Sequence, residues 1–237
     1  MIFKIKLLGA KNIYAQILIL SVVMYALIIF ASEYVYDDVA TSKSPWVFLL
    51  AFFLSAYLYV LIALVRKLGL DRRIIRWLNW VPILVYIFGT ATIYVDMSFM
   101  GAAKPYFFSL AHVFSLSFMS VCIYTILRHI FGSAETKTDH IWGATIAYLL
   151  LVVIFAEIYE FITIFNPTYL GKVYVMGTPN YIQCLMFSIN TMSGLDSIYP
   201  EAHPILKKLA SLESVIGNLF LVIILGRLLS HPLKRGG

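Results

Sequence analysis

The sequence has few charged residues and no long hydrophilic segment. Only 13% of its 237 residues are charged, 61% are hydrophobic, and the mean hydropathy is +0.88. A soluble domain carries about twice this share of charge, so the composition is typical of a protein whose main solvent is lipid. With so little polar sequence, no soluble enzymatic, nucleotide-binding or ligand-binding domain is expected.

Cysteine and paired histidine are also scarce. Cys122 and Cys184 lie in apolar stretches, which gives no support for a disulfide, a zinc site or a redox pair, and we interpret both as small buried residues. His112 has no second histidine at ligand spacing, so we interpret it as a hydrogen-bonded structural residue. We predict no metal site, no cofactor and no enzymatic activity.

The formal net charge of +6 does not indicate nucleic-acid binding. The cationic residues separate long apolar runs and form no soluble basic face, so the expected partner is the lipid bilayer and not a nucleic acid. A voltage sensor is not expected either. It needs arginines at every third position of a span, and residues 105–127 contain none.

Seven apolar runs approach the roughly 20 residues that a membrane-spanning helix needs. They cover residues 12–32, 44–65, 77–95, 105–127, 140–156, 173–195 and about 209–230. The first run is too long for a signal peptide, and we predict an uncleaved span. The fifth is interrupted by Glu157 and Glu160, but apolar residues continue to Phe165.

The sixth run contains Gly177-Thr178-Pro179-Asn180, which would break a helix near its start. The remainder, from Tyr181 to about Asn190, is too short to cross a bilayer, so we expect it to enter and leave on one side. The predicted fold is therefore an all-α integral membrane protein with six transmembrane helices, a re-entrant pore helix and a filter loop.

The distribution of lysine and arginine predicts the orientation of these spans. In a six-span arrangement, thirteen of the 18 cationic residues lie on one side, which the positive-inside rule identifies as cytoplasmic. Both termini are then cytoplasmic, in a multi-pass protein of the plasma membrane or bacterial inner membrane. The cytoplasmic residues are Lys4, Lys6, Lys11, Arg66, Lys67, Arg72, Arg73, Arg76, Arg128, Lys137, Arg227, Lys234 and Arg235.

A small polar linker at 132–136 divides the chain into two predicted domains. Residues 1–134 would form a four-helix transmembrane bundle. Residues 135–237 would form a pore domain, with an outer helix at about 140–165, a pore helix and filter at about 179–200, and an inner helix at about 205–230.

The second domain resembles a known family. The stretch Phe187-Ser-Ile-Asn-Thr-Met-Ser-Gly-Leu-Asp-Ser-Ile-Tyr-Pro200 is similar to the pore helix and selectivity filter of potassium channels, which usually read T-x-x-T-V-G-Y-G-D-x-x-P. Leu209-Ala-Ser-Leu-Glu-Ser-Val-Ile-Gly217, followed by Gly226-Arg227-Leu, resembles the inner helix of bacterial two-helix pore domains. The resemblance covers roughly residues 140–230 and implies a potassium-channel-like pore-loop protein with a divergent filter.

The filter departs from the family pattern. It reads TMSGLDS where TVGYGD is usual, and Gly194 alone of the two filter glycines is kept. Two alignments remain open, because the Thr-Val pair is either replaced by Met192-Ser193 or deleted. The resemblance assigns the candidate filter to Thr191, Met192, Ser193, Gly194, Leu195 and Asp196.

The resemblance implies a homotetramer that conducts a monovalent cation, with potassium as the expected ion. Four copies of Asp196 would form a ring of carboxylates, which attracts cations with weaker discrimination than carbonyl coordination gives. The alternative is a non-conducting channel homologue that acts as a regulatory or structural subunit. A carrier is not favoured, because it would need repeated broken helices and the sequence has a single broken segment.

Several polar residues outside the filter are further candidates. Glu213 lies about nine residues into the last helix, roughly 14 Å deep, and is either a support paired with Ser193 or Asn190 or a solvated interface residue. Gly217 is either a gating hinge or a close-packing position. Glu157 and Glu160 share a helix face, and with Ser197 they either concentrate cations at the pore mouth or support the base of the pore helix.

Overall fold

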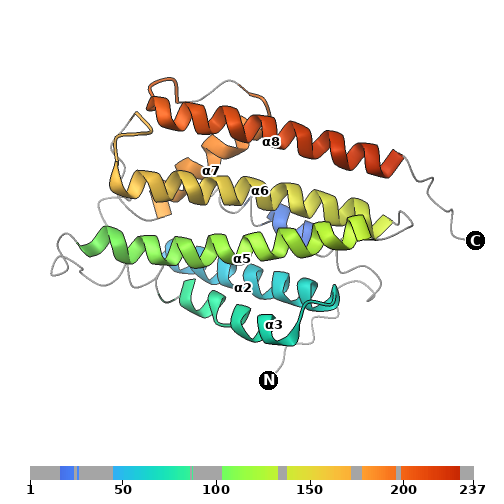
Figure 1. Cartoon of the computed structure of the whole chain (residues 1–237). Coiled ribbons are helices and arrows are strands. Elements are labelled where there is room, and N and C mark those ends of the chain that lie inside the picture. Colours follow the sequence, from blue (N-terminus) through green and yellow to red (C-terminus); the bar gives the residue numbers. More distant parts are fainter. Residues whose placement is uncertain are drawn as a thin grey trace, which may run out of the picture.

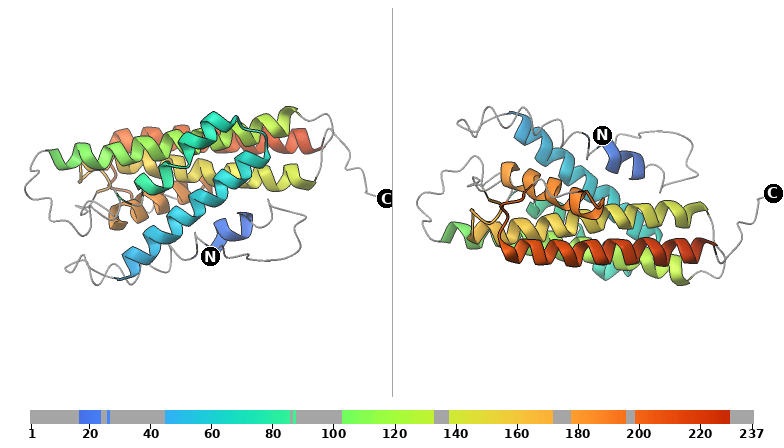
Figure 2. Two further views of the ribbon diagram at one scale, coloured as in Figure 1. Left: turned by 90° about the horizontal axis from the view of Figure 1, so that it is seen from below. Right: turned by 90° about the horizontal axis from the view of Figure 1, so that it is seen from above.

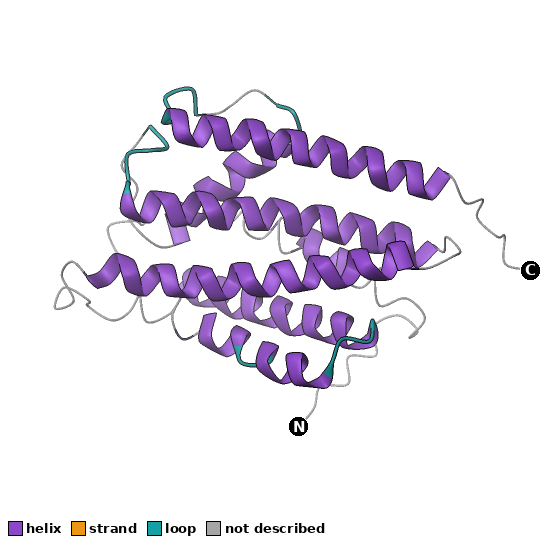
Figure 3. Ribbon diagram, viewed as in Figure 1, coloured by secondary structure: helices purple, strands orange, loops and turns teal. Residues whose placement is uncertain are grey.

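Helices are the regular elements throughout the part of the chain that the computed structural model describes, which is residues 17–23, 26, 45–85, 87, 103–132, 138–171, 178–195 and 199–229. Figure 3 shows helices joined by loops and no strand in these ranges. The principal helices are α2 (Pro45–Lys67), α3 (Arg72–Leu78), α5 (Lys104–Gly132), α6 (Thr138–Phe165), α7 (Thr178–Met192) and α8 (Pro204–Leu229).

Three helices are long and apolar enough to cross a membrane. They are the segments Pro105–Gly132 of α5, His140–Phe165 of α6 and Pro204–Arg227 of α8. This confirms, for the described residues, an all-helical protein that has helices apolar enough to span a membrane. The predicted total of six spans and the tetramer remain predictions.

The third apolar run, residues 77–95, does not begin as one continuous helix. Asp71 caps α3 by accepting a 2.7 Å hydrogen bond from the Arg73 amide, and α3 already ends at Leu78. A turn at 79–80 follows, and residues 81–85 are again helical. Asn79 is a poor residue for a helix interior because its side chain competes for backbone hydrogen bonds, which is consistent with a break there.

The long helices lie side by side, with α2, α5 and α8 running in one direction and α6 in the other (Figures 1 and 2). α5 packs against α6 and α2, while α7 packs against α6 and α8. The α2–α3 turn, the end of α5, the start of α6 and the end of α8 lie at one end of the bundle, here called the basic end. The opposite end, here called the loop end, holds the end of α6 and the starts of α7 and α8.

Most of α8 is covered only on one side. Leu212, Val215, Leu219 and Val222 are more than half exposed, whereas Glu213 on the same helix is fully buried. Exposure of such a long apolar face to water is energetically unfavourable, whereas lipid or a second copy of the chain would cover it. α8 therefore has a large surface available for lipid or subunit contact.

Candidate functional site

α7 enters the bundle from the loop end and stops inside it. Its first turn is tied to the end of α6 by a 2.8 Å hydrogen bond from Asn180 Nδ2 to Thr163 Oγ1. The carbonyl of its last residue, Met192, accepts a 3.1 Å hydrogen bond from the hydroxyl of Tyr148, in the first half of α6. α7 thus runs antiparallel to α6, and its 15 residues span about 22 Å, less than the roughly 30 Å of a bilayer core.

The chain then returns to the loop end, where α8 begins. The amide of His203 donates a 2.7 Å hydrogen bond to the carbonyl of Tyr169, and the two side-chain rings stack with centroids 4.0 Å apart. Tyr199 also donates a hydrogen bond to Gln183, in the first half of α7. The segment between α6 and α8 is therefore a hairpin that enters and leaves at one end of the bundle.

The tip of this hairpin is a helix C-cap centred on Gly194. Gly194 has φ +68°, its amide donates to Thr191 O at 3.2 Å, and the Leu195 amide donates to Asn190 O at 3.0 Å. This pair of bonds with a left-handed glycine is the Schellman arrangement. Thr191 and Met192 consequently belong to α7, and Thr191 Oγ1 donates to Phe187 O at 2.9 Å.

The helical conformation of Thr191 and Met192 favours one of the two filter alignments. It is the alignment in which the Thr-Val pair is deleted, because an ion-coordinating Thr-Val pair would have to leave the helix. Ser193, Gly194 and Leu195 follow the helix and are exposed, with Leu195 at 62%. Asp196 and Ser197, the other two predicted residues of this loop, lie outside the described residues.

Glu213 is completely buried between α6, α7 and α8, so the solvated-interface interpretation was wrong. Its oxygens lie 2.5 Å from the hydroxyl of Tyr159 and 2.5 Å from the hydroxyl of Ser188. The expected partners were wrong as well, since Ser193 is exposed and the Asn190 side chain donates to Met186 O at 2.9 Å.

Depth along the helices would have identified Ser188. It lies ten residues into α7, about 15 Å from the loop end, and Glu213 lies at nearly the same depth in α8. Asn190 and Ser193 lie deeper. Tyr159 gave no comparable signal, because an apolar helix does not reveal which of its aromatic residues face a neighbour.

Gly217 lies where α8 crosses the end of α7. A Cβ atom at this position would stand 2.7 Å from Met192 Sδ and 3.1 Å from Met192 Cε. Small residues permit such close approach between membrane helices. The geometry supports the close-packing interpretation of Gly217.

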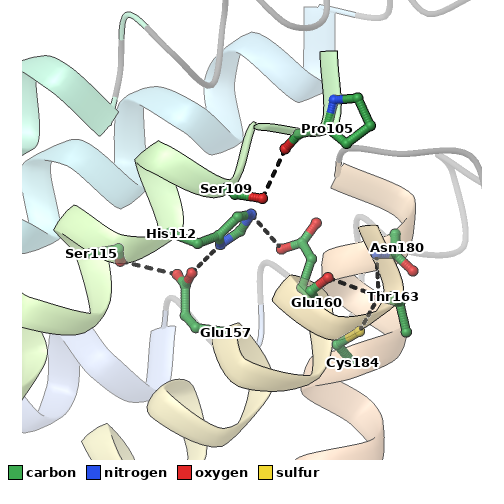
Figure 4. Close-up of polar contacts among 9 residues, drawn as sticks. All are labelled: Pro105, Ser109, His112, Ser115, Glu157, Glu160, Thr163, Asn180 and Cys184. Carbon is green, nitrogen blue, oxygen red and sulfur yellow. Dashed lines mark hydrogen bonds and ion pairs between the residues drawn. The ribbon is translucent and has the colours of Figure 1, made fainter. Parts of the chain in front are cut away.

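Glu157 and Glu160 form a second buried cluster, between α6 and α5 (Figure 4). His112 of α5 points between them: its Nδ1 hydrogen-bonds Glu157, and its Nε2 lies 3.5 Å from Glu160 Oε2. Ser115 also donates a 3.0 Å hydrogen bond to Glu157. The sequence had indicated a hydrogen-bonded His112 but not these partners.

This histidine–carboxylate cluster is connected to the base of α7. Thr163 Oγ1 donates a 3.0 Å bond to the Glu160 carbonyl and accepts the bond from Asn180 (Figure 4). Cys184 Sγ lies 3.7 Å from the same hydroxyl. The buried carboxylates of Glu157 and Glu160 therefore join α6 to α5, and the link to the base of α7 runs through the Glu160 backbone carbonyl and Thr163.

The described residues contain no group of three or more His, Cys, Asp or Glu side chains arranged to hold a metal ion. Comparison of the chain with protein-family models, with curated proteins and with solved structures finds no significant match. The resemblance to pore-loop channels therefore remains an expectation from the motifs.

Proposed function

We propose that this protein is a passive cation channel of the pore-loop class. The observation that carries the proposal is α7, a helix that penetrates the bundle to part of its depth and ends in an exposed turn, Ser193 to Leu195. A helix C-terminus carries a partial negative charge, and directed at a membrane-buried path it stabilises a cation. Non-helical backbone at that depth is tolerated where it lines such a path.

A single copy of this hairpin cannot enclose an ion path, so the proposal includes a homo-oligomer, by resemblance a tetramer. The exposed apolar face of α8 supplies surface for contact between copies and with lipid. Copies arranged around one axis would bring the Ser193–Leu195 turns and the adjacent Asp196 side chains together. In that arrangement α7 is held in position, on its side away from the ion path, by Glu213, Tyr159 and Ser188.

The short tip predicts weak selectivity. Potassium filters use successive carbonyl rings and a threonine hydroxyl ring, whereas here Thr191 is helical and its hydroxyl bonds Phe187. The carbonyls of Ser193, Gly194 and Leu195 and the Asp196 carboxylate would be the ion-facing groups. We expect potassium and sodium to permeate at similar rates, as partly hydrated ions.

A second candidate, a non-conducting relative that serves as a structural or regulatory subunit, is favoured by a different observation. The carbonyls of Asn190, Thr191 and Met192 all accept hydrogen bonds within the protein. Each therefore has one acceptor site already used, which makes it a weaker replacement for the hydration shell of an ion. Few coordinating groups remain in the described part of the tip.

Ion flux through the purified protein in liposomes separates the two candidates. Potassium and sodium gradients should be compared for the wild type, for Asp196→Asn, and for Asp71→Asn as a matched control. Asp71 caps α3 at the opposite end of the bundle, and asparagine caps a helix equally well, so this variant loses one charge without a stability cost.

Similar potassium and sodium fluxes that fall in Asp196→Asn and persist in Asp71→Asn support the channel. No flux above protein-free vesicles at any voltage, with an ionophore confirming intact gradients, contradicts it and favours the structural subunit. Cross-linking of the reconstituted protein should yield four-copy species if the oligomer is the proposed one.

A further inference from the structure

The basic end carries a concentration of cationic side chains. Six of them are contributed by the end of α2, by α3 and by the last turns of α5, and Asp71 is the one acidic residue in the stretch 66–76. In the described part of the chain none of the six takes part in an ion pair. All are exposed: Arg66, Lys67, Arg72, Arg73, Arg76 and Arg128.

A hollow of about 430 Å³ lies between the α2–α3 turn and α5, and Arg128 is the one of these six residues that lines it. Gly69 lies in its wall, and a side chain built on Gly69 would meet no atom within 4 Å. Tyr124, Arg128 and His129 line the opposite wall, and the lining contains no Asp or Glu. The hollow is thus lined by polar and apolar groups, with Arg128 as its cationic side chain and without a negative side chain.

Side chains, and not backbone amides, must recognise whatever binds here. The amides of Leu68, Gly69 and Leu70 are all used in hydrogen bonds to the last turn of α2. The Arg128 guanidinium, the His129 ring and the Tyr124 hydroxyl remain as lining groups that donate hydrogen bonds. A guanidinium pairs with phosphate through two parallel hydrogen bonds, so the chemistry of the hollow suits a phosphate group.

The surroundings suit a phosphate that belongs to a lipid. Trp77 and Trp80 are 77% and 58% exposed, and Ile74 and Phe131 are also exposed. Exposed tryptophan beside arginine is typical of the level of lipid headgroups in a membrane. Apolar neighbours would be covered by acyl chains, which a free phosphate ion does not have.

We propose that this hollow binds the phosphate headgroup of an anionic phospholipid, with Arg128 as its principal contact. Basic pockets beside membrane helices on the cytoplasmic side favour such lipids. The positive-inside distribution assigns the basic end to that side. The site lies at the opposite end of the bundle from the loop end, where α7 and α8 begin, and binding there does not depend on ion conduction.

Native mass spectrometry of the detergent-solubilised full chain tests the proposal. Wild type should retain phosphatidylglycerol at least tenfold better than phosphatidylcholine. Arg128→Gln should lose most of this preference, by about tenfold, the factor that corresponds to 1.4 kcal/mol. Arg128→Lys, which keeps the charge but not the planar pair of donors, should be intermediate and also guards against a folding defect.

Two control variants distinguish a defined lipid site from general electrostatic attraction of anionic lipid to the basic end. Arg76→Gln removes a charge from the same end but outside the hollow, and Lys208→Gln removes one at the loop end. Both should retain nearly the wild-type preference. A loss in Arg76→Gln equal to that in Arg128→Gln, or equal retention of both lipids by wild type, overturns the proposal. Displacement of the lipid by millimolar inorganic phosphate overturns the lipid assignment in favour of a free phosphate site.

Discussion

The Tyr159 hydroxyl lies 2.5 Å from one oxygen of the Glu213 carboxylate, and this contact joins α6 to α8. The second carboxylate oxygen lies 2.5 Å from Ser188 Oγ of α7, which is itself 2.9 Å from the carbonyl of Val152. Three helices therefore meet at one buried carboxyl group. Because both oxygens of this buried carboxyl group are hydrogen-bonded, Glu213 holds α7 in position.

Glu213→Gln should be much less destabilising than Glu213→Ala. Ser188 has one hydroxyl proton and two acceptors within 3 Å, so a group at position 213 that can donate as well as accept suits the site. Glutamine can accept from Tyr159 and donate to Ser188, whereas alanine leaves the buried Tyr159 hydroxyl unpartnered, at about 1–3 kcal/mol, and leaves Ser188 with the Val152 carbonyl alone. Titration with a denaturing detergent in micelles measures the difference.

The control for this prediction is a tyrosine outside the network. Tyr159→Phe should cost about 1–3 kcal/mol because it removes the donor to a buried carboxyl group. Tyr106→Phe, at an exposed position, should cost nearly nothing. Equal effects of the two tyrosine variants would show that the Tyr159 contact contributes no stability.

His112→Leu should destabilise the protein by about 3–5 kcal/mol, because it leaves Glu157 and Glu160 buried without their cationic or hydrogen-bonding partner. The triple variant His112→Leu, Glu157→Leu, Glu160→Leu should be more stable than the single variant, since it buries no unpaired polar group. Thermal unfolding in detergent compares the two. A triple variant that is less stable by the sum of the three single effects would contradict the pairing.

Gly194→Ala should weaken the end of α7 by about 1–2 kcal/mol, because residue 194 has φ +68°, where a Cβ atom is strained. Gly194→Asn should cost less, since asparagine tolerates this conformation. Hydrogen exchange of the amides of residues 189–195 reports the local effect. Gly226→Ala in α8 is the matched control, because its Cβ would meet no neighbour, and it should leave this exchange unchanged.

Gly217→Ala tests the hinge against the packing interpretation. The new methyl group would approach Met192 Sδ to 2.7 Å, so the variant should lose about 1–3 kcal/mol by overpacking. Met192→Ala has its own cost, because Met192 is buried, but in that background Gly217→Ala should cost much less if packing is the role of Gly217. A defect in ion flux that Gly217→Ala still causes in the Met192→Ala background would instead indicate a hinge.

The predicted orientation can be checked by labelling single cysteines in intact cells. An impermeant maleimide should modify Glu201→Cys at the loop end without permeabilisation, and Arg72→Cys at the basic end only after it. Wild type is the control, because Cys122 and Cys184 are fully buried and should not react. Labelling of Arg72→Cys in intact cells would reverse the assignment of sides.

The start of α7 could be predicted from the sequence, whereas its end and the contacts around it could not. The start of α7 near Pro179, and hence a helix too short to cross a bilayer, follow from local chemistry, since proline and glycine interrupt helices. The end of α7 was not predicted correctly, because Thr191 and Met192 had been assigned to the filter and they prolong the helix instead. Their conformation depends on the bond from Tyr148 and the cap at Gly194.

The sequence by itself determined the apolar, all-helical character of this protein and the position of α7, but it left Glu213 as either a buried support or a solvated interface residue. Only the tertiary structure decided that Glu213 meets Tyr159 and Ser188, and that His112 meets Glu157 and Glu160. The composition and the length of an apolar run are local properties, so they can be read from one segment of the sequence. A membrane helix is apolar on nearly every face, so its pattern does not specify its rotation, and the partners of its few polar groups are set by packing.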